Sequence, residues 1–395
     1  MVRARLASVR RPCRHLRTYG DEAVMVMRVL IIGGYGNFGS YIAKSLADDL
    51  AIQLLIGGRS SEKGSRFIVG LTTANPAEPH AIDINGDIGA ALARIGPQLV
   101  IHTTGPFQAQ DHRVARACIA HGCHYLDLAD ARDFVATIGT LDAEAKGMGV
   151  LVVSGASSVP CLTAAVIDHY LPGFERLDSV DYGISAAQQT NRGLATTSAI
   201  LSYVGKTFET IRDGKPHNVI GWQDTHSEPY PELGRRWFGN CDIPDLALFP
   251  ARYPLLKTMR FAAGHELAIL HAGTWLLSWA VRLSFIRSLS PHAERLLRIA
   301  FLFDWMGTSR SGFHMYLSGT GHEGSAKTAR FFLIARSGHG PYIPCMPAIL
   351  LARKLARGKL DRVGAMPCVD LIGLDEYLAA LKGLDISVIA DPVHE

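Results

Sequence analysis

Three glycines, Gly34, Gly36 and Gly39, have the spacing of a turn that binds a phosphorylated ligand. They follow the apolar run 29–32 and precede residues 40–46, which have the composition of a helix. In such a turn the first glycine permits the tight bend, the second lets the backbone approach a pyrophosphate, and the third lets helix and strand pack closely. The helix N-terminus would offer free N–H groups to the phosphates. A turn without a ligand is the alternative. The cofactor-binding residues expected here are Gly34, Tyr35, Gly36, Asn37, Phe38 and Gly39.

The tip of the second expected strand, 52–56, indicates which dinucleotide would bind. A Rossmann domain specific for NAD carries an acid here that binds the ribose 2′-hydroxyl. This chain instead has Arg59 and Ser60, with Lys63 close behind. A carboxylate would repel a 2′-phosphate, whereas a guanidinium binds one with two hydrogen bonds. The sequence therefore predicts NADP (as NADPH) as the cofactor. The alternative is that Arg59 is a solvated loop arginine.

Two more strand tips are expected to border the cofactor, because ligands of such sheets lie at the carboxyl ends of the strands. The turn after strand 99–103 should lie near the nicotinamide ribose, and Asp83, in the expected strand 81–84, near the adenine. An ordinary turn and a helix cap are the respective alternatives. The residues in question are Asp83, Thr104, Gly105, Pro106 and Phe107.

Strand-like and helix-like segments alternate over the first 150 residues, which predicts a parallel sheet covered on both faces. The fold class expected is α/β, a Rossmann doubly wound parallel sheet with an inserted α+β substrate domain. A helix is expected over 131–146. The six strands are expected at 29–32, 52–56, 81–84, 99–103, 124–128 and 150–153.

Five runs of sequence resemble the saccharopine dehydrogenase/reductase-like family. They are GGYGNFG at 33–39, GGRS at 57–60, TTGPF at 103–107, CHYLDLAD at 123–130 and VVSGASSVP at 152–160. The resemblance implies an NADP-binding Rossmann domain and hydride transfer at C–N bonds of secondary amines derived from amino acids. It also implies a substrate domain inserted before the chain returns to the Rossmann domain.

The expected layout has four parts. Residues 1–26 form a basic tail that is expected to be disordered. Residues 27–157 form the NADP-binding domain, 158–340 the substrate or oligomerisation domain, and 341–395 a segment that returns to the Rossmann domain. The tail can alternatively be a transit peptide, or an artefact of the start site, since Met25 and Met27 stand just before the first strand.

Three residues are candidates for catalysis. Asp127 and Asp130, at the tip of the fifth strand, can orient a substrate amine or relay a proton, and Arg192, at a helix start, can bind a carboxylate. The histidines and the seven cysteines show no metal-binding spacing, so no metal is expected.

Residues 268–286 form an apolar stretch that holds Trp275 and Trp279 but also His271 and Arg282. A spanning helix needs about 20 apolar residues with few charges. The alternatives are a buried helix or helix pair, a helix on a membrane surface, or the wall of an apolar substrate pocket.

The charge distribution argues against a nucleic-acid partner. Residues 1–22 hold six arginines and two acidic residues, and the rest of the chain has no net formal charge. Without a secretory signal and without paired cysteines, we expect a cytoplasmic protein.

The sequence as a whole predicts an NADP-dependent oxidoreductase acting on a C=N, C–N or related carbonyl group. The alternative is a non-catalytic or membrane-associated NADP-binding protein. The partners expected are a small-molecule substrate and, as open options, a second copy in a homodimer and a membrane touched peripherally by residues 268–286.

Overall fold

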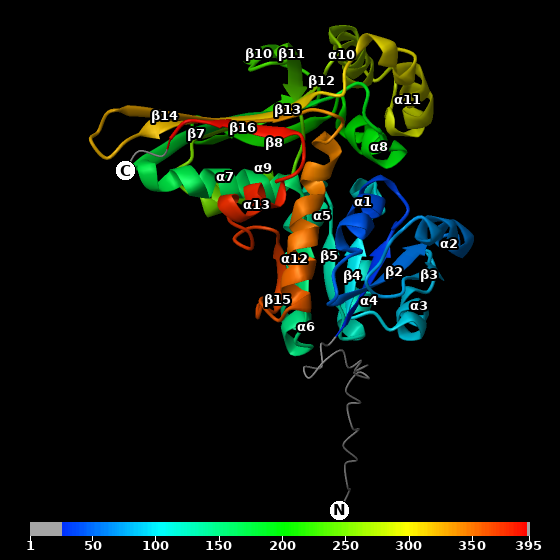
Figure 1. Cartoon of the computed structure of the whole chain (residues 1–395). Helices are drawn as coiled ribbons and strands as arrows, with labels where there is room; N and C mark the ends of the chain where they lie inside the picture. The colour runs from blue at the N-terminus through cyan, green and yellow to red at the C-terminus, as the bar shows by residue number, and fades with distance from the viewer. Residues whose placement is uncertain (1–25, 393–395) are drawn as a thin grey trace, which may run out of the picture.

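The computed structural model describes residues 26–392 and contains two seven-stranded sheets, one above the other in Figure 1. The first sheet lies in the blue and cyan part of the chain, and the second spans the top of the view. The tail predicted at 1–26 lies outside the described residues except for residue 26.

The first sheet is parallel throughout and has the order β15-β6-β5-β4-β1-β2-β3, which confirms the predicted Rossmann sheet. Its central strands are apolar on both faces because helices cover both sides. The strands are β1 (Met27–Ile32), β2 (Ile52–Gly58), β3 (Glu78–Ala81), β4 (Leu99–His102), β5 (His124–Asp127), β6 (Leu151–Ser154) and β15 (Gly364–Pro367).

Two elements of this domain differ from the prediction. Strand β3 ends at Ala81 rather than beginning there, and Asp83 lies in a turn in which its Oδ1 accepts the N–H of Asn85 at 3.0 Å. The helix expected over 131–146 is broken into α5 (Arg132–Ala136), a 3-10 turn and α6 (Asp142–Gly147). The Thr137 hydroxyl bonds back to the carbonyl of Asp133, and Gly139 follows, so this stretch disfavours a continuous helix.

The helices divide between the two faces of the first sheet. The cluster on one face includes α1, α2 and α12, and the cluster on the other includes α3, α4 and α6. The helices on the two faces are α1 (Asn37–Leu46), α2 (Ser61–Val69), α3 (Ile88–Ile95), α4 (Arg113–Ala120) and α12 (Met346–Ala356), together with α6.

The second sheet is mixed and has the order β10-β11-β12-β7-β13-β14-β16, as the predicted α+β domain requires. A separate hairpin joins β8 to β9, and α7, α9 and α13 lie beneath the sheet (Figure 1). The strands are β7 (Arg176–Ala186), β8 (Thr207–Arg212), β9 (Lys215–Ile220), β10 (His226–Tyr230), β11 (Gly234–Asn240), β12 (Thr258–His265), β13 (Ser311–Thr320), β14 (Ala326–Ala335) and β16 (Ile386–Ala390). The helices beneath it are α7 (Thr163–Tyr170), α9 (Asp245–Arg252) and α13 (Leu374–Ala380).

The two sheets share one continuous core. It joins Ile31 and Leu126 of the first sheet to Met315 and Leu333 of the second. The segment 341–395, assigned from sequence to the Rossmann domain, is divided: β15 pairs with β6, but β16 pairs with β14 of the second sheet. All five residues of β16 pair with residues 331–335 of β14, so β16 forms the edge of the second sheet.

Three helices close one end of the second sheet: α8 (Leu194–Tyr203), α10 (Ala268–Arg282) and α11 (Ala293–Phe301). They pack through Leu201, Val281 and Ala293 around the buried Trp222. The apolar stretch 268–286 is therefore not a wholly buried helix, because only His271, Ser278 and Val281 of α10 are buried. Across residues 26–392, no helix has the length and apolar character needed to cross a membrane.

Candidate functional site

The glycine turn lies between β1 and α1, as predicted. The N–H groups of Gly33 and Gly34 both bond the carbonyl of Gly57 on β2, at 2.9 and 3.1 Å. Gly33 has φ +86°, a conformation that favours glycine. Gly36 is the N-cap of α1 and provides no side-chain cap, so the first N–H groups of the helix point outward without a capping side chain.

Gly36 and Gly39 serve different purposes. A Cβ on Gly39 would lie 2.2 Å from the carbonyl oxygen of Gly33, so only glycine allows α1 to pack this closely against the turn. A Cβ on Gly36 would have one close neighbour, the same oxygen at 3.1 Å. Gly36 thus keeps the outer side of the turn bare, which fits an approaching pyrophosphate.

The tip of β2 carries two exposed cations, Arg59 and Lys63. Neither has an acidic partner among the residues that the structure describes, whereas Glu62 on the same helix pairs with Arg66. The Ser60 hydroxyl accepts the N–H of Lys63 at 3.2 Å and so caps α2. The hydroxyl of Tyr35 accepts the N–H of Ser60 at 3.1 Å, which ties the glycine turn to this tip.

The tip of β4 holds the predicted turn Thr104–Phe107. Gln110 Nε2 fixes it by donating to the carbonyls of Thr104 and Pro106, at 2.7 and 3.0 Å. Phe107 is buried against Phe134, as expected for an ordinary turn. The Thr104 hydroxyl, however, is buried and has no hydrogen-bond partner.

The two candidate carboxylates at the carboxyl end of β5, Asp127 and Asp130, differ in whether they face the cavity. Asp127 is fully buried, and its Oδ1 accepts the N–H groups of Ala129 and Gly155 and the hydroxyl of Ser154, at 2.8 to 3.0 Å. Its pKa is raised to about 6 by burial despite these bonds. Asp127 therefore fastens the tips of β5 and β6 to each other and does not line the substrate space.

Asp130, in contrast, lines a cavity of about 840 Å³ between the two domains. Its Oδ1 accepts a hydrogen bond of 3.1 Å from Gln108 Nε2. Burial raises the pKa of Asp130 above its ordinary value. Ser157, just beyond β6, and Phe38 of α1 line the same cavity, which therefore begins at the cofactor edge of the first sheet.

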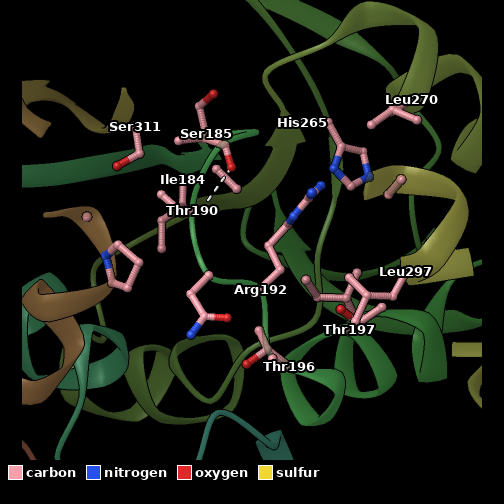
Figure 2. Close-up of a pocket in the computed structure, with 18 of the residues that line it drawn as sticks. Ile184, Ser185, Thr190, Arg192, Thr196, Thr197, His265, Leu270, Leu297 and Ser311 are labelled. Atoms are coloured by element: carbon pink, nitrogen blue, oxygen red, sulfur yellow. Dashed lines mark hydrogen bonds between the residues drawn. The ribbon is translucent and has the colours of Figure 1, made fainter. Parts of the chain in front are cut away.

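Arg192 also lines the cavity and points toward His265 (Figure 2). Its guanidinium pairs with Asp304, and its planar group lies 4.8 Å from the ring centre of Phe301. Arg192 Nε is buried without a partner. The predicted carboxylate binder is thus already paired on one side and has donor capacity left on the other.

Sequence reasoning missed two groups at this cavity. His265 ends β12, bonds Thr274 Oγ1 at 3.2 Å, and has a pKa lowered to about 3, chiefly by burial, so it is neutral near pH 7. Asn191 lies beside the glycine turn, with its side chain bonded to that of Asn37 at 2.8 Å. His265 stands in no local motif, and the sequence around Asn191 gives no signal for its contact with Asn37, which is 154 positions away.

His102 and the described cysteines do not form a second catalytic or metal-binding site. His102, on β4, is buried and bonds the Tyr125 hydroxyl at 3.0 Å, so it belongs to the core. The six described cysteines are buried free thiols, and Cys13 lies outside the described residues. Residues 26–392 contain no group of three or more His, Cys, Asp or Glu side chains that could hold a metal ion.

Comparison with known proteins identifies the first domain. Residues 29–153 match the family model described as the saccharopine dehydrogenase NADP binding domain. The match contains the glycine turn, Arg59, Asp127 at the end of β5 and Asp130 just beyond it. Residues 29–153 therefore form a domain of the saccharopine dehydrogenase NADP-binding type, and the resemblance seen in the sequence is confirmed for this part of the chain.

Solved structures extend the likeness in fold to the whole chain. The apo saccharopine dehydrogenase (L-Glu forming) of Saccharomyces cerevisiae matches with a TM-score of 0.63 and 12% identity, over 93% of this chain and 100% of that one. An amine dehydrogenase from Mycobacterium smegmatis gives a TM-score of 0.45 at 11% identity, over 89% and 95%. A biliverdin reductase from Synechocystis gives 0.41 at 13%, over 90% and 96%. No curated protein matches this chain.

Proposed function

We propose that this protein is an NADPH-dependent oxidoreductase that transfers hydride to or from a C=N, C–N or related carbonyl group. One observation supports this proposal above the others. The carboxyl edge of the Rossmann sheet opens directly into the 840 Å³ cavity, so a nicotinamide bound at this edge would meet a substrate there.

The residues present fit a phosphorylated dinucleotide. The bare side of Gly36 and the uncapped start of α1 suit the pyrophosphate, and the unpartnered Thr104 hydroxyl suits the nicotinamide side. Arg59 and Lys63 would hold the 2′-phosphate. When bound, the cofactor supplies or accepts the hydride.

Asp130 is our candidate for the proton transfer. Reduction of a C=N or C=O bond adds a hydride to carbon and a proton to nitrogen or oxygen. Asp130 lines the cavity, and its raised pKa keeps its proton to higher pH than an exposed carboxylate would. We assign Asp127, which is enclosed by its three donors, the task of positioning the Asp130 loop.

Arg192 is our candidate for orienting the substrate. Asp304 already balances its charge, so a substrate need not bring a carboxylate to this position. The unpartnered Nε can instead donate to a neutral acceptor such as a carbonyl oxygen.

The experiment that tests the proposal is a titration with NADPH and NADH, followed by a screen for NADPH oxidation with imines, keto acids and apolar aldehydes or ketones. We expect saturable binding that favours NADPH, and turnover with at least one class. No binding of either dinucleotide would refute the proposal. Binding without turnover on any class would favour a non-catalytic NADP-binding protein.

A second candidate function, peripheral attachment to a membrane, is favoured by the outer face of α10. Ile269, Trp275, Leu276, Trp279 and Leu283 are exposed on it at spacings of three, four and seven residues. Interfacial helices place aromatic and aliphatic side chains on one such face.

Sedimentation with phosphatidylcholine vesicles, with and without phosphatidylglycerol, tests this attachment. Leu283→Glu should reduce the fraction bound, and Leu50→Glu, at an exposed leucine on the first domain, should not. Equal sedimentation of both variants and the unaltered protein would contradict a membrane contact through α10.

A further inference from the structure

The cavity extends well beyond the cofactor edge. From Asp130 and Ser157 it continues between α8, α10 and α11, where Ile200, Leu277 and Leu297 line it. Its volume of about 840 Å³ lies near the upper end of ligand pockets, which run from about 300 to 1,000 Å³. It has room for a large substrate besides the nicotinamide.

The chemistry of the walls selects against a polar substrate. Among the described residues, Asp130, Arg192 and His265 are the only ionisable side chains that line the cavity, and Arg192 is paired with Asp304. His265 is neutral. A substrate with several charges would leave them buried without partners among the leucines and isoleucines of the three helices, which is costly.

The rim of the cavity is apolar as well. Ile269 and Leu276 of α10 and Ile299 of α11 line the cavity, yet are 56%, 61% and 50% exposed. Leu283 and Leu302, the residues that follow α10 and α11 in the chain, are exposed as well. Of the twenty exposed large hydrophobic residues in the described chain, eleven lie between 269 and 306. Such a concentration on a protein surface marks an interaction site.

We propose that this cavity binds a long aliphatic chain, with the reacting group of that molecule at Asp130 and the chain running beneath α10 and α11 toward the rim. The location of the reacting end rests on the proposed oxidoreductase function. The binding of the chain depends only on the cavity and its walls.

The charges around the rim favour a lipid bilayer as the source of this molecule. Arg282, Arg287, Arg295 and Arg298 are exposed on or beside α10 and α11, and Glu294 is the acidic residue that accompanies them on α11. Arginines beside an apolar, Trp-rich surface suit the anionic headgroups of a membrane.

Gly273 offers a direct test. It lines the cavity from α10, and a Cβ built there would have no atom within 4 Å, so a larger side chain would project into open space. Gly273→Phe would occupy the cavity, and Gly273→Ala is the matched control on the same helix. The probe is 11-(dansylamino)undecanoic acid, whose fluorescence reports an apolar environment.

We expect saturable binding of the probe by the unaltered protein and by Gly273→Ala, and at least tenfold weaker binding by Gly273→Phe, with the NADPH affinity unchanged in all three. Equal probe affinity in Gly273→Phe, or no saturable binding by the unaltered protein, would overturn the proposal. Probe binding without NADPH binding would instead refute the proposed function and leave the aliphatic site standing.

A second measurement needs no variant. A fatty acid with a photoreactive diazirine, irradiated with the unaltered protein, should label peptides of α8, α10 or α11; labelling confined to other segments would overturn the proposal. A dansyl-labelled phospholipid in phosphatidylglycerol vesicles tests the source: probe transfer from vesicles supports the bilayer, and binding of the free acid alone overturns it.

Discussion

Asn37 and Asn191 bond each other across the boundary between the two domains. Asn191 Nδ2 donates to Asn37 Oδ1 at 2.8 Å, and Asn37 Nδ2 donates to the backbone carbonyl of Asn191 at 3.3 Å. Asn37 is the first residue of α1, and Asn191 precedes Arg192 at the cavity wall. The pair therefore sets the position of the cavity wall relative to the cofactor turn.

Replacing Asn191 by alanine should impair turnover more than cofactor binding. The loss of about one hydrogen bond, worth roughly 1 kcal/mol, should lower kcat/KM about fivefold by releasing the wall, while the NADPH affinity changes less than twofold. Steady-state kinetics and an NADPH titration measure the two effects. Asn218→Ala, at an exposed asparagine on β9, is the control and should match the unaltered protein. An equal loss in affinity and turnover would contradict this division.

Arg59→Ala should distinguish the two dinucleotides. Loss of the charge-assisted bonds to the 2′-phosphate, worth about 1.5–3 kcal/mol, should weaken NADPH binding roughly 10- to 100-fold and leave NADH binding nearly unchanged. Fluorescence titration measures both affinities. Arg66→Ala, which removes a cation paired with Glu62 on the same helix, should affect neither. An equal loss for both cofactors would refute the phosphate assignment.

The two glycines of the turn should respond differently to substitution. Gly36→Val should keep its melting temperature within a few degrees but lose NADPH binding, because the valine fills the pyrophosphate space. Gly39→Ala should lose about 1–3 kcal/mol of stability, because its Cβ would overlap the Gly33 carbonyl oxygen. Thermal melts and titrations on both variants check this. Gly139→Ala, where a Cβ meets nothing within 4 Å, is the control.

The protonation of Asp130 should determine how the rate of reduction depends on pH. Burial raises its pKa, so its acid form persists above the ordinary range, and the rate of reduction should fall as pH rises through that raised pKa. Asp130→Asn should lower kcat by about 10² to 10⁴ and abolish this fall. Initial rates between pH 4 and 9 measure it, with Asp133→Asn, at an exposed carboxylate on α5, as the control. His265, with its pKa near 3, cannot produce a fall in this window. An unchanged profile in Asp130→Asn would assign the proton to another group.

The positions of the glycine turn and of the cations after β2 could be predicted because their signals are local. The bend at Gly33 to Gly39 and the cations at Arg59 and Lys63 stand within a few residues of the strands that position them. The burial of Asp127 could not be predicted, because it depends on donors from Gly155 and Ser154, 28 and 27 positions away in the chain.

In the second domain, too, features that depend on contacts between distant segments could not be predicted from the sequence. The composition of residues 268–286 left three alternatives open, and only the packing of α8 and α11 decides which sides of α10 are covered. The cavity wall is built from segments that range from Phe38 to Pro344, and no spacing within one segment encodes how they meet. The same holds for β16, whose choice of sheet depends on β14 rather than on its own residues.

The C-terminal segment makes the stability of the Rossmann domain depend on that of the second domain. Because β15 completes one sheet and β16 the edge of the other, a single cut between the halves would leave each with an unpaired strand edge. Heat or denaturant should accordingly melt the whole chain in one step, and neither half would persist after proteolysis of its neighbour.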